Sequence, residues 1–131
     1  MKILLFLLLS VNILAIEPYQ YKAEVLEVHD GDTITARVDL GFDVSVVKDF
    51  RLLDVYAPEM KEPTGPTCQK KLHSMIPVGI KIEIISLKTK TGSDLKSFDR
   101  YIAIVKYKGR DINKEMVEWL KKNNYTGGIG K

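Results

Sequence analysis

The sequence predicts a small α+β domain in which five strands form an OB-type barrel and two helices pack beside it. Five short segments carry the alternating or β-branched pattern of strands. One helical pattern separates the third segment from the fourth, and a second helical pattern follows the fifth. The chain has 131 residues and no internal repeat, which is enough for one modest domain. An antiparallel sheet of five such strands is expected to curl into a barrel.

The first 15 residues have the form of a short secretory signal peptide. Lys2 gives a positive start, residues 3–14 are almost entirely apolar, and Ala15 is a small residue suited to cleavage. The apolar run is shorter than the roughly 20 residues of a membrane-spanning helix, and an uncleaved membrane anchor is the alternative. We therefore expect one domain over residues 16–131 that is secreted or periplasmic, monomeric and not stably attached to a membrane.

Composition limits the class of protein without deciding it. The chain holds 20 basic and 17 acidic residues, a net charge of +3. This balance permits nucleic-acid binding, but it is not the strong basicity of a histone-like protein. Cys68 is the single cysteine, which excludes an internal disulfide and a multi-cysteine zinc site. We expect it to be a half-buried helix residue, and a reactive thiol is the alternative.

The first three strands are predicted to form a meander. Residues 22–28 carry β-branched and apolar residues among charges, and Asp30 and Gly31 then form a strong turn signal. Residues 33–39 alternate cleanly between apolar and polar, as a half-buried strand does. Residues 44–53 are rich in valine and give the third strand.

The second half of the chain is predicted to add two helices and two strands. After a loop at 58–66, Pro66 fits the first position of a helix. A fourth strand is expected over residues 80–87, then an exposed mobile loop at 88–97 and a fifth strand over 100–107. Asn113 is the predicted N-cap of the second helix. Its apolar side comprises Ile112, Met116, Val117, Trp119 and Leu120.

Two arginines and a glutamate stand at strand ends where a site would form. Arg51 lies among apolar residues, so it is either a buried ion-pair partner or a cation that faces a ligand. Arg100 begins the fifth strand, and Glu59 follows Pro58, where the third strand must stop. The guanidinium fork binds phosphate oxygens in pairs and stays charged at working pH. Together these residues favour a site that binds and cleaves a phosphodiester over a structural ion pair.

Three stretches together resemble the signature segments of the staphylococcal nuclease-like (thermonuclease-like) family, in its compact bacterial and phage form. They are Val28-His29-Asp30-Gly31-Asp32-Thr33-Ile34, Phe50-Arg51-Leu52-Leu53 through Ala57-Pro58-Glu59, and Ser97-Phe98-Asp99-Arg100-Tyr101-Ile102-Ala103. Their order and approximate spacing match over about residues 23–125. The resemblance implies a metal-dependent endonuclease that hydrolyses DNA, with RNA as a second candidate substrate, and has little sequence specificity.

The resemblance also implies a metal site in which calcium is the usual ion. Asp32 would be a ligand, because hard cations take carboxylate and carbonyl oxygens. The backbone carbonyl of Ala57 would be a second ligand, and Asp30 would lie in the outer shell.

The same resemblance assigns the catalytic and substrate contacts. Glu59 would orient or deprotonate the attacking water, a typical task of a placed general base. Arg51 and Arg100 would hold the phosphate and stabilise the charge of the transition state. Phe98 would stack on a base, and Tyr125 would line the substrate groove by family analogy.

Tyr56 is the main departure from the family pattern, because the family usually has an aspartate at that position. A phenol has a pKa of about 10 and is a poor calcium ligand, so calcium binding is expected to be weaker. Asp54, where relatives often have glycine, would share a strand face with Tyr56 and could partly replace the lost carboxylate. Alternatively, Asp54 is a solvated acid and Tyr56 stacks on a base. A further alternative is an OB module with impaired catalysis that binds nucleic acid or protein.

Overall fold

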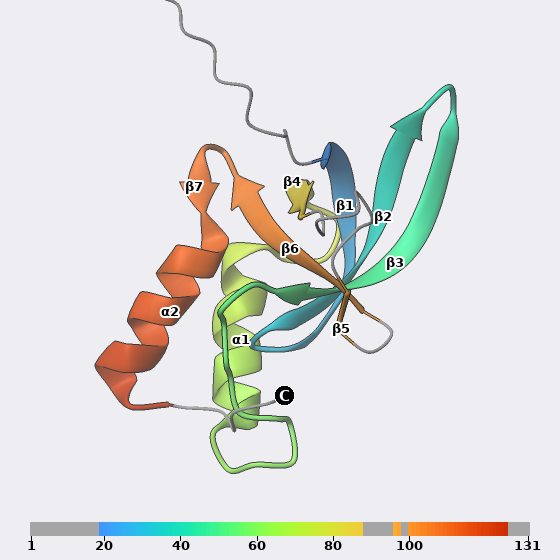
Figure 1. Cartoon of the computed structure of the whole chain (residues 1–131). Coiled ribbons are helices and arrows are strands. Elements are labelled where there is room, and N and C mark those ends of the chain that lie inside the picture. The colour runs from blue at the N-terminus through green and yellow to red at the C-terminus, as the bar shows by residue number, and fades with distance from the viewer. Residues whose placement is uncertain (1–18, 88–95, 98–99, 126–131) are drawn as a thin grey trace, which may run out of the picture.

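The computed structural model describes residues 19–87, 96–97 and 100–125, and its strands close into a barrel (Figure 1). Neighbouring strands of the wall pair in the order β3-β2-β1-β4-β6, and β6 pairs again with β3. The predicted α+β, OB-type architecture with five barrel strands and two helices is confirmed. The wall consists of β1 (Tyr19–Asp30), β2 (Thr33–Gly41), β3 (Val44–Leu52), β4 (Lys81–Ser86) and β6 (Arg100–Tyr107).

The strand pair that closes the barrel is parallel, whereas the sequence predicted an antiparallel sheet. Phe50 lies opposite Tyr101, and the pairing runs in parallel for three residues to Leu52 and Ala103. Two short strands were not predicted, β5 (Lys96–Ser97) and β7 (Arg110–Asp111), which both pair with β6. Strands of two residues are too short to show a hydrophobic period, so sequence patterns do not detect them.

The barrel is filled by one side of each strand. The predicted alternation in β2 is observed, since Ile34, Ala36 and Val38 are buried. Ile82 and Ile84 of β4 join the same buried cluster. The opposite faces of β2 and β3 point away from this core, so polar residues there are available to build a site.

Helix α1 (Gly65–Met75) covers one end of the barrel, beside β1 (Figure 1). Pro66 is its second residue, one position later than the first position that the sequence predicted. Cys68, Leu72 and Met75 form the buried stripe. Cys68 is completely buried, not half-buried as expected, because it packs beneath the turn that joins β1 to β2.

Helix α2 (Ile112–Asn123) begins two residues earlier than the sequence predicted. Asp111, not Asn113, is the N-cap, and its side chain accepts a hydrogen bond from the Lys114 amide at 3.0 Å. The first turn also carries a pair between Arg110 and Glu115 at 2.6 Å. The hydrogen bond to Arg110 lowers the pKa of Glu115, and the same bond raises the pKa of Arg110.

Asn113 is a buried crosslink between α2 and the barrel, so the prediction that it caps the helix is wrong. Its side-chain oxygen accepts from the Val105 amide at 2.9 Å. Its amide nitrogen donates to the carbonyls of Ala103 at 3.0 Å and Leu53 at 3.1 Å. Three backbone groups are therefore satisfied by one side chain, at the place where β3 ends beside β6.

We predict that Asn113→Ala lowers the free energy of unfolding by about 3 kcal/mol, because buried backbone groups lose their partners. Chemical unfolding followed by circular dichroism measures the change. Asn123→Ala is the matched control, since Asn123 is exposed and donates to the Trp119 carbonyl of its own helix. Equal stabilities of the two variants would contradict the crosslink role.

Several sequence predictions fall outside the described residues. They are the signal peptide at 1–15, most of the loop at 88–97, and Phe98. Within the described part of the chain, neither helix has the length and apolar character needed to cross a membrane.

Candidate functional site

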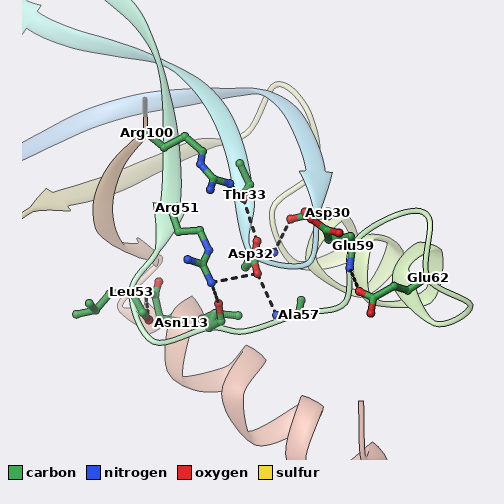
Figure 2. A network of polar contacts seen from close by, with 11 residues as sticks. Asp30, Asp32, Thr33, Arg51, Leu53, Ala57, Glu59, Glu62, Arg100 and Asn113 are labelled. Atoms are coloured by element: carbon green, nitrogen blue, oxygen red, sulfur yellow. Dashed lines mark hydrogen bonds and ion pairs between the residues drawn. The ribbon is translucent and has the colours of Figure 1, made fainter. Parts of the chain in front are cut away.

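Asp32 is the centre of a buried polar network at the start of β2 (Figure 2). One carboxylate oxygen accepts from the Thr33 hydroxyl at 2.9 Å. The other accepts from the Ala57 amide at 3.0 Å and lies 3.5 Å from the Arg51 guanidinium. The Asp32 amide in turn donates to the Asp30 side chain at 3.0 Å. The network joins the turn after β1 to the segment after β3, which are adjacent in space but distant in sequence.

The turn between β1 and β2 depends on a glycine. A Cβ atom at Gly31 would lie 2.6 Å from the Cβ of Ala57 and 3.0 Å from that of Cys68. Real side chains essentially never approach so closely, so a larger residue would push the turn away from α1 and from the Ala57 segment. The Asp-Gly-Asp motif therefore fixes Asp32 against the Ala57 amide.

Arg51 is buried and adopts the structural contact that the sequence left as one alternative. Its terminal nitrogen donates to the Val55 carbonyl at 2.9 Å and to Asp32. The ring of Tyr56 lies over the guanidinium, with a centroid distance of 5.3 Å. Arg51 thus holds the chain after β3 in the bend that brings Ala57 to Asp32.

Arg100 is the more accessible of the two arginines, because it is half-buried. It donates to the Thr33 hydroxyl at 3.1 Å, and that hydroxyl donates to Asp32. The chain of contacts from Arg100 through Thr33 and Asp32 to Arg51 brings the two arginines of the sequence prediction into one cluster (Figure 2). A cluster with two guanidinium groups at one end of a barrel is suited to hold an anion such as phosphate.

Asp54 does not share a strand face with Tyr56, so that part of the prediction is wrong. Strand β3 ends at Leu52, and Asp54 lies in the following turn with a positive φ of 62°. Aspartate tolerates this left-handed backbone better than most residues, and glycine tolerates it best. Asp54 is exposed, and Tyr56 is about half exposed above Arg51. The hypothesis that Asp54 replaces the missing carboxylate of position 56 assumed that both residues lie on one strand face. The structure does not show that arrangement.

Glu59 stands at the edge of the network, two residues after Ala57. Its backbone takes part in a tight turn, because its amide donates to the Glu62 carboxylate at 2.5 Å and its carbonyl accepts from the Glu62 amide. Its own carboxylate is about half exposed and lies 3.7 Å from the Lys61 ammonium. The turn holds the Glu59 backbone while leaving its side chain in contact with solvent.

Of the two predicted substrate contacts beyond Tyr56, only Tyr125 belongs to the described residues. Phe98 lies outside the described residues. Tyr125 is half-buried against Trp119, with ring centroids 5.4 Å apart. Its contact with the second helix extends the core at the C-terminal end of α2.

The donor set around Asp32 fits a weakly held, largely hydrated cation better than an enclosed calcium ion. Calcium takes six to eight oxygen ligands, whereas magnesium keeps several waters and uses one or two carboxylates. Asp32 and Asp30 supply two carboxylates, and Asp32 already accepts three hydrogen bonds. In the described part of the chain, no three His, Cys, Asp or Glu side chains are grouped as metal ligands. Asp32, Asp30 and the Ala57 carbonyl would hold such a cation, with water completing its shell.

Sequence reasoning did not assign a role to Thr33 or to the Val55 carbonyl. The Thr33 hydroxyl connects Arg100 to Asp32, and the Val55 carbonyl accepts from Arg51. Thr33 was visible as a polar residue at the first position of an alternating strand. The Val55 carbonyl leaves no sequence signal, because every residue has one.

A larger groove of about 940 Å³ lies beside the β2–β3 and β6–β7 turns and shares no residue with the Asp32 network. Five basic and four acidic side chains line it, and Arg37 pairs with Glu24 at 3.3 Å across neighbouring strands. Charges of both signs largely cancel there, so the groove does not resemble a phosphate-binding surface.

A search against models of known protein families found no match for this chain, and no curated protein matched it.

Proposed function

We propose that the chain is a nuclease that hydrolyses phosphodiester bonds of DNA, with RNA as a second substrate and with little sequence specificity. The observation that supports this most strongly is the cluster in which Arg100, Thr33, Asp32 and Arg51 are joined by consecutive contacts. Two guanidinium groups beside a carboxylate are well suited to a phosphate that gains negative charge during attack by water. The resemblance of the surrounding motifs to the thermonuclease-like family supports the same reaction.

We assign different roles to Arg100, Arg51 and Glu59 according to how buried each side chain is. Arg100 is accessible and would bind the non-bridging phosphate oxygens directly. Arg51 is held by Val55 and by Asp32, so its positive charge is preorganised at the same end of the barrel. Glu59 is solvent-exposed at the end of the network and would take the proton of the attacking water.

A divalent cation at Asp32 belongs to the proposal, and calcium is the ion that the family resemblance implies. When bound, it would neutralise phosphate charge and favour the ionisation of water. Tyr56 supplies no carboxylate, so we expect millimolar rather than micromolar cation to be needed for activity. Export from the cytoplasm and a monomeric state are part of the same proposal.

The rival function is a nucleic-acid binding module without catalysis. It is favoured by the Asp32 carboxylate, which is buried and already bonded to three protein donors. A site of this kind could hold a phosphate with Arg100 and yet fail to cleave it.

The test is incubation of the purified protein with single-stranded DNA in calcium, magnesium, manganese or EDTA. We predict cleavage with a divalent cation and none in EDTA. We also predict that Tyr56→Asp binds calcium about tenfold more tightly by calorimetry, since ligand charge sets the affinity of such sites. Tyr56→Phe is the matched control, because it keeps the ring over Arg51 and adds no carboxylate.

Two outcomes would count against the proposal. DNA binding without cleavage under every cation would favour the binding module. If Tyr56→Asp and Tyr56→Phe bind calcium with the same affinity, the cation does not bind at the Asp32 network.

A further inference from the structure

A small pocket opens at the mouth of the barrel, on the inner side of the wall. It holds about 110 Å³ and is walled by the rings of Tyr21, Phe50 and Tyr101, by aliphatic residues of β2 and β3, and by Ser86 and Lys48. We call it the barrel-mouth pocket. It shares no residue with the Asp32 network.

Ser86 gives this pocket a polar group that points to a ligand. Ser86 is 2% exposed, and its hydroxyl has no hydrogen-bond partner among the described residues. A buried hydroxyl without a partner destabilises a fold, so native proteins rarely retain one. It lies at the end of β4 and lines a pocket whose other walls are mostly apolar. An incoming group that forms a hydrogen bond with Ser86 would satisfy it.

The size and lining of the pocket select a flat ring. An engineered apolar cavity of about 150 Å³ holds benzene, so an open pocket of 110 Å³ admits one ring rather than two. Phe50 and Tyr101 pack with ring centroids 6.4 Å apart at an angle of 44°. Aromatic walls of this kind stack on nucleobases of any sequence. The Lys48 ammonium lies 6.0 Å from the Tyr101 ring, where it could meet an attached phosphate.

The pocket lies close to the arginine cluster along the chain. The parallel pairing of β3 with β6 begins at Phe50 and Tyr101. Arg100 directly precedes Tyr101, and Arg51 directly follows Phe50. Because neighbouring residues of a strand point to opposite faces, the arginines and the two pocket rings lie on opposite faces of the same strand pair.

We propose that the barrel-mouth pocket binds a pyrimidine base of single-stranded nucleic acid, with Ser86 bonding the edge of the base. This inference rests on the proposed nucleic-acid function and adds a base subsite to it. It assigns a role to the buried Ser86 hydroxyl, which has no hydrogen-bond partner among the described residues.

The test is an NMR titration of the ¹⁵N-labelled protein with uridine, which carries no phosphate and so does not depend on the arginines. We expect shifts confined to amides around Ser86, Phe50 and Tyr101. Ser86→Ala should weaken uridine binding about fivefold, the loss expected for one hydrogen bond. The same variant should unfold at an equal or higher temperature, because it removes a buried polar group without a partner. A merely structural serine would not give weaker binding together with a more stable fold.

Two further variants sharpen the test. Ser74→Ala is the matched control, since Ser74 lies on the exposed side of α1 and donates to the Lys71 carbonyl of the same helix; it should bind uridine as the wild type does. Val46→Phe fills the pocket from its β3 wall and should abolish binding.

The inference is overturned if millimolar uridine causes no shifts, or if Ser86→Ala and Val46→Phe bind it unchanged. Benzyl alcohol that binds as tightly as uridine would show a pocket for any ring and would also overturn it. If the protein cleaves DNA but does not bind uridine, only the base subsite is refuted. If it binds uridine but cleaves no nucleic acid, only the proposed nuclease activity is refuted.

Discussion

Arg51→Ala is expected to lower the free energy of unfolding by about 3 kcal/mol or more, because it removes a guanidinium that pairs with the buried carboxylate of Asp32. The Asp32 side chain is fully buried, and the Arg51 guanidinium lies 3.5 Å from it. Arg51 also holds the Val55 carbonyl at 2.9 Å. Its loss should therefore loosen the bend that carries Ala57 to Asp32. Urea unfolding measures the change, and DNA cleavage by the variant should fall with it.

A double-mutant cycle separates the ion pair from other effects of the Arg51 substitution. Arg51→Ala combined with Asp32→Asn should be less destabilising than the sum of the single variants, since the double variant removes both charges of the pair. Arg110→Ala is the control for loss of a surface arginine, because its pair with Glu115 is exposed. An Arg51→Ala protein as stable as Arg110→Ala would contradict a structural role for the buried pair.

Much of the barrel could be predicted because its strands are locally encoded. The alternation of residues 33–39 places Ile34, Ala36 and Val38 inside, where they are found. Glycine and proline signals also place the turns and the first helix close to their observed positions. These features depend on residues that are neighbours in the sequence, so one sequence suffices to see them.

The features that were missed depend on contacts between distant segments. The parallel pairing of β3 with β6 joins residues about fifty positions apart, and no local pattern marks it. Asn113 fits an N-cap by residue type, but its side chain turns inward to three backbone groups of β6 and the segment after β3. Asp111, two residues earlier, is an equally good cap and takes that place.

In the candidate site too, some features could be predicted from the sequence and others depend on contacts between distant segments. The two arginines and Asp32 were selected by residue type, and the fold brings them into one network. Two features of the site could be seen only in the three-dimensional structure. They are the Thr33 hydroxyl that connects Arg100 to Asp32, and the left-handed backbone at Asp54. Glu59 was selected by its position after Pro58, and its half-exposed carboxylate lies 3.7 Å from the Lys61 ammonium.

Arg100 is the residue whose loss should affect cleavage most cleanly. Its side chain is half-buried and bonds to the Thr33 hydroxyl, which still has Asp32 as its acceptor when Arg100 is removed. Arg100→Ala should therefore keep the fold. Because the guanidinium would act on charge that develops in the transition state, we expect kcat/KM for single-stranded DNA to fall by about 10²–10³-fold. Arg100→Lys keeps the charge but loses the fork, so it should be intermediate.

The most direct test of the proposed hydrolase is the rate of single-stranded DNA cleavage by the wild type, Arg100→Ala and Arg110→Ala, purified in parallel and assayed with a divalent cation. We predict cleavage by the wild type and Arg110→Ala at similar rates, and a loss of at least about 100-fold in Arg100→Ala with an unchanged unfolding midpoint. Cleavage by a folded Arg100→Ala protein at the wild-type rate would contradict the assignment of the site. Absence of cleavage by the wild type with every cation would contradict the reaction itself.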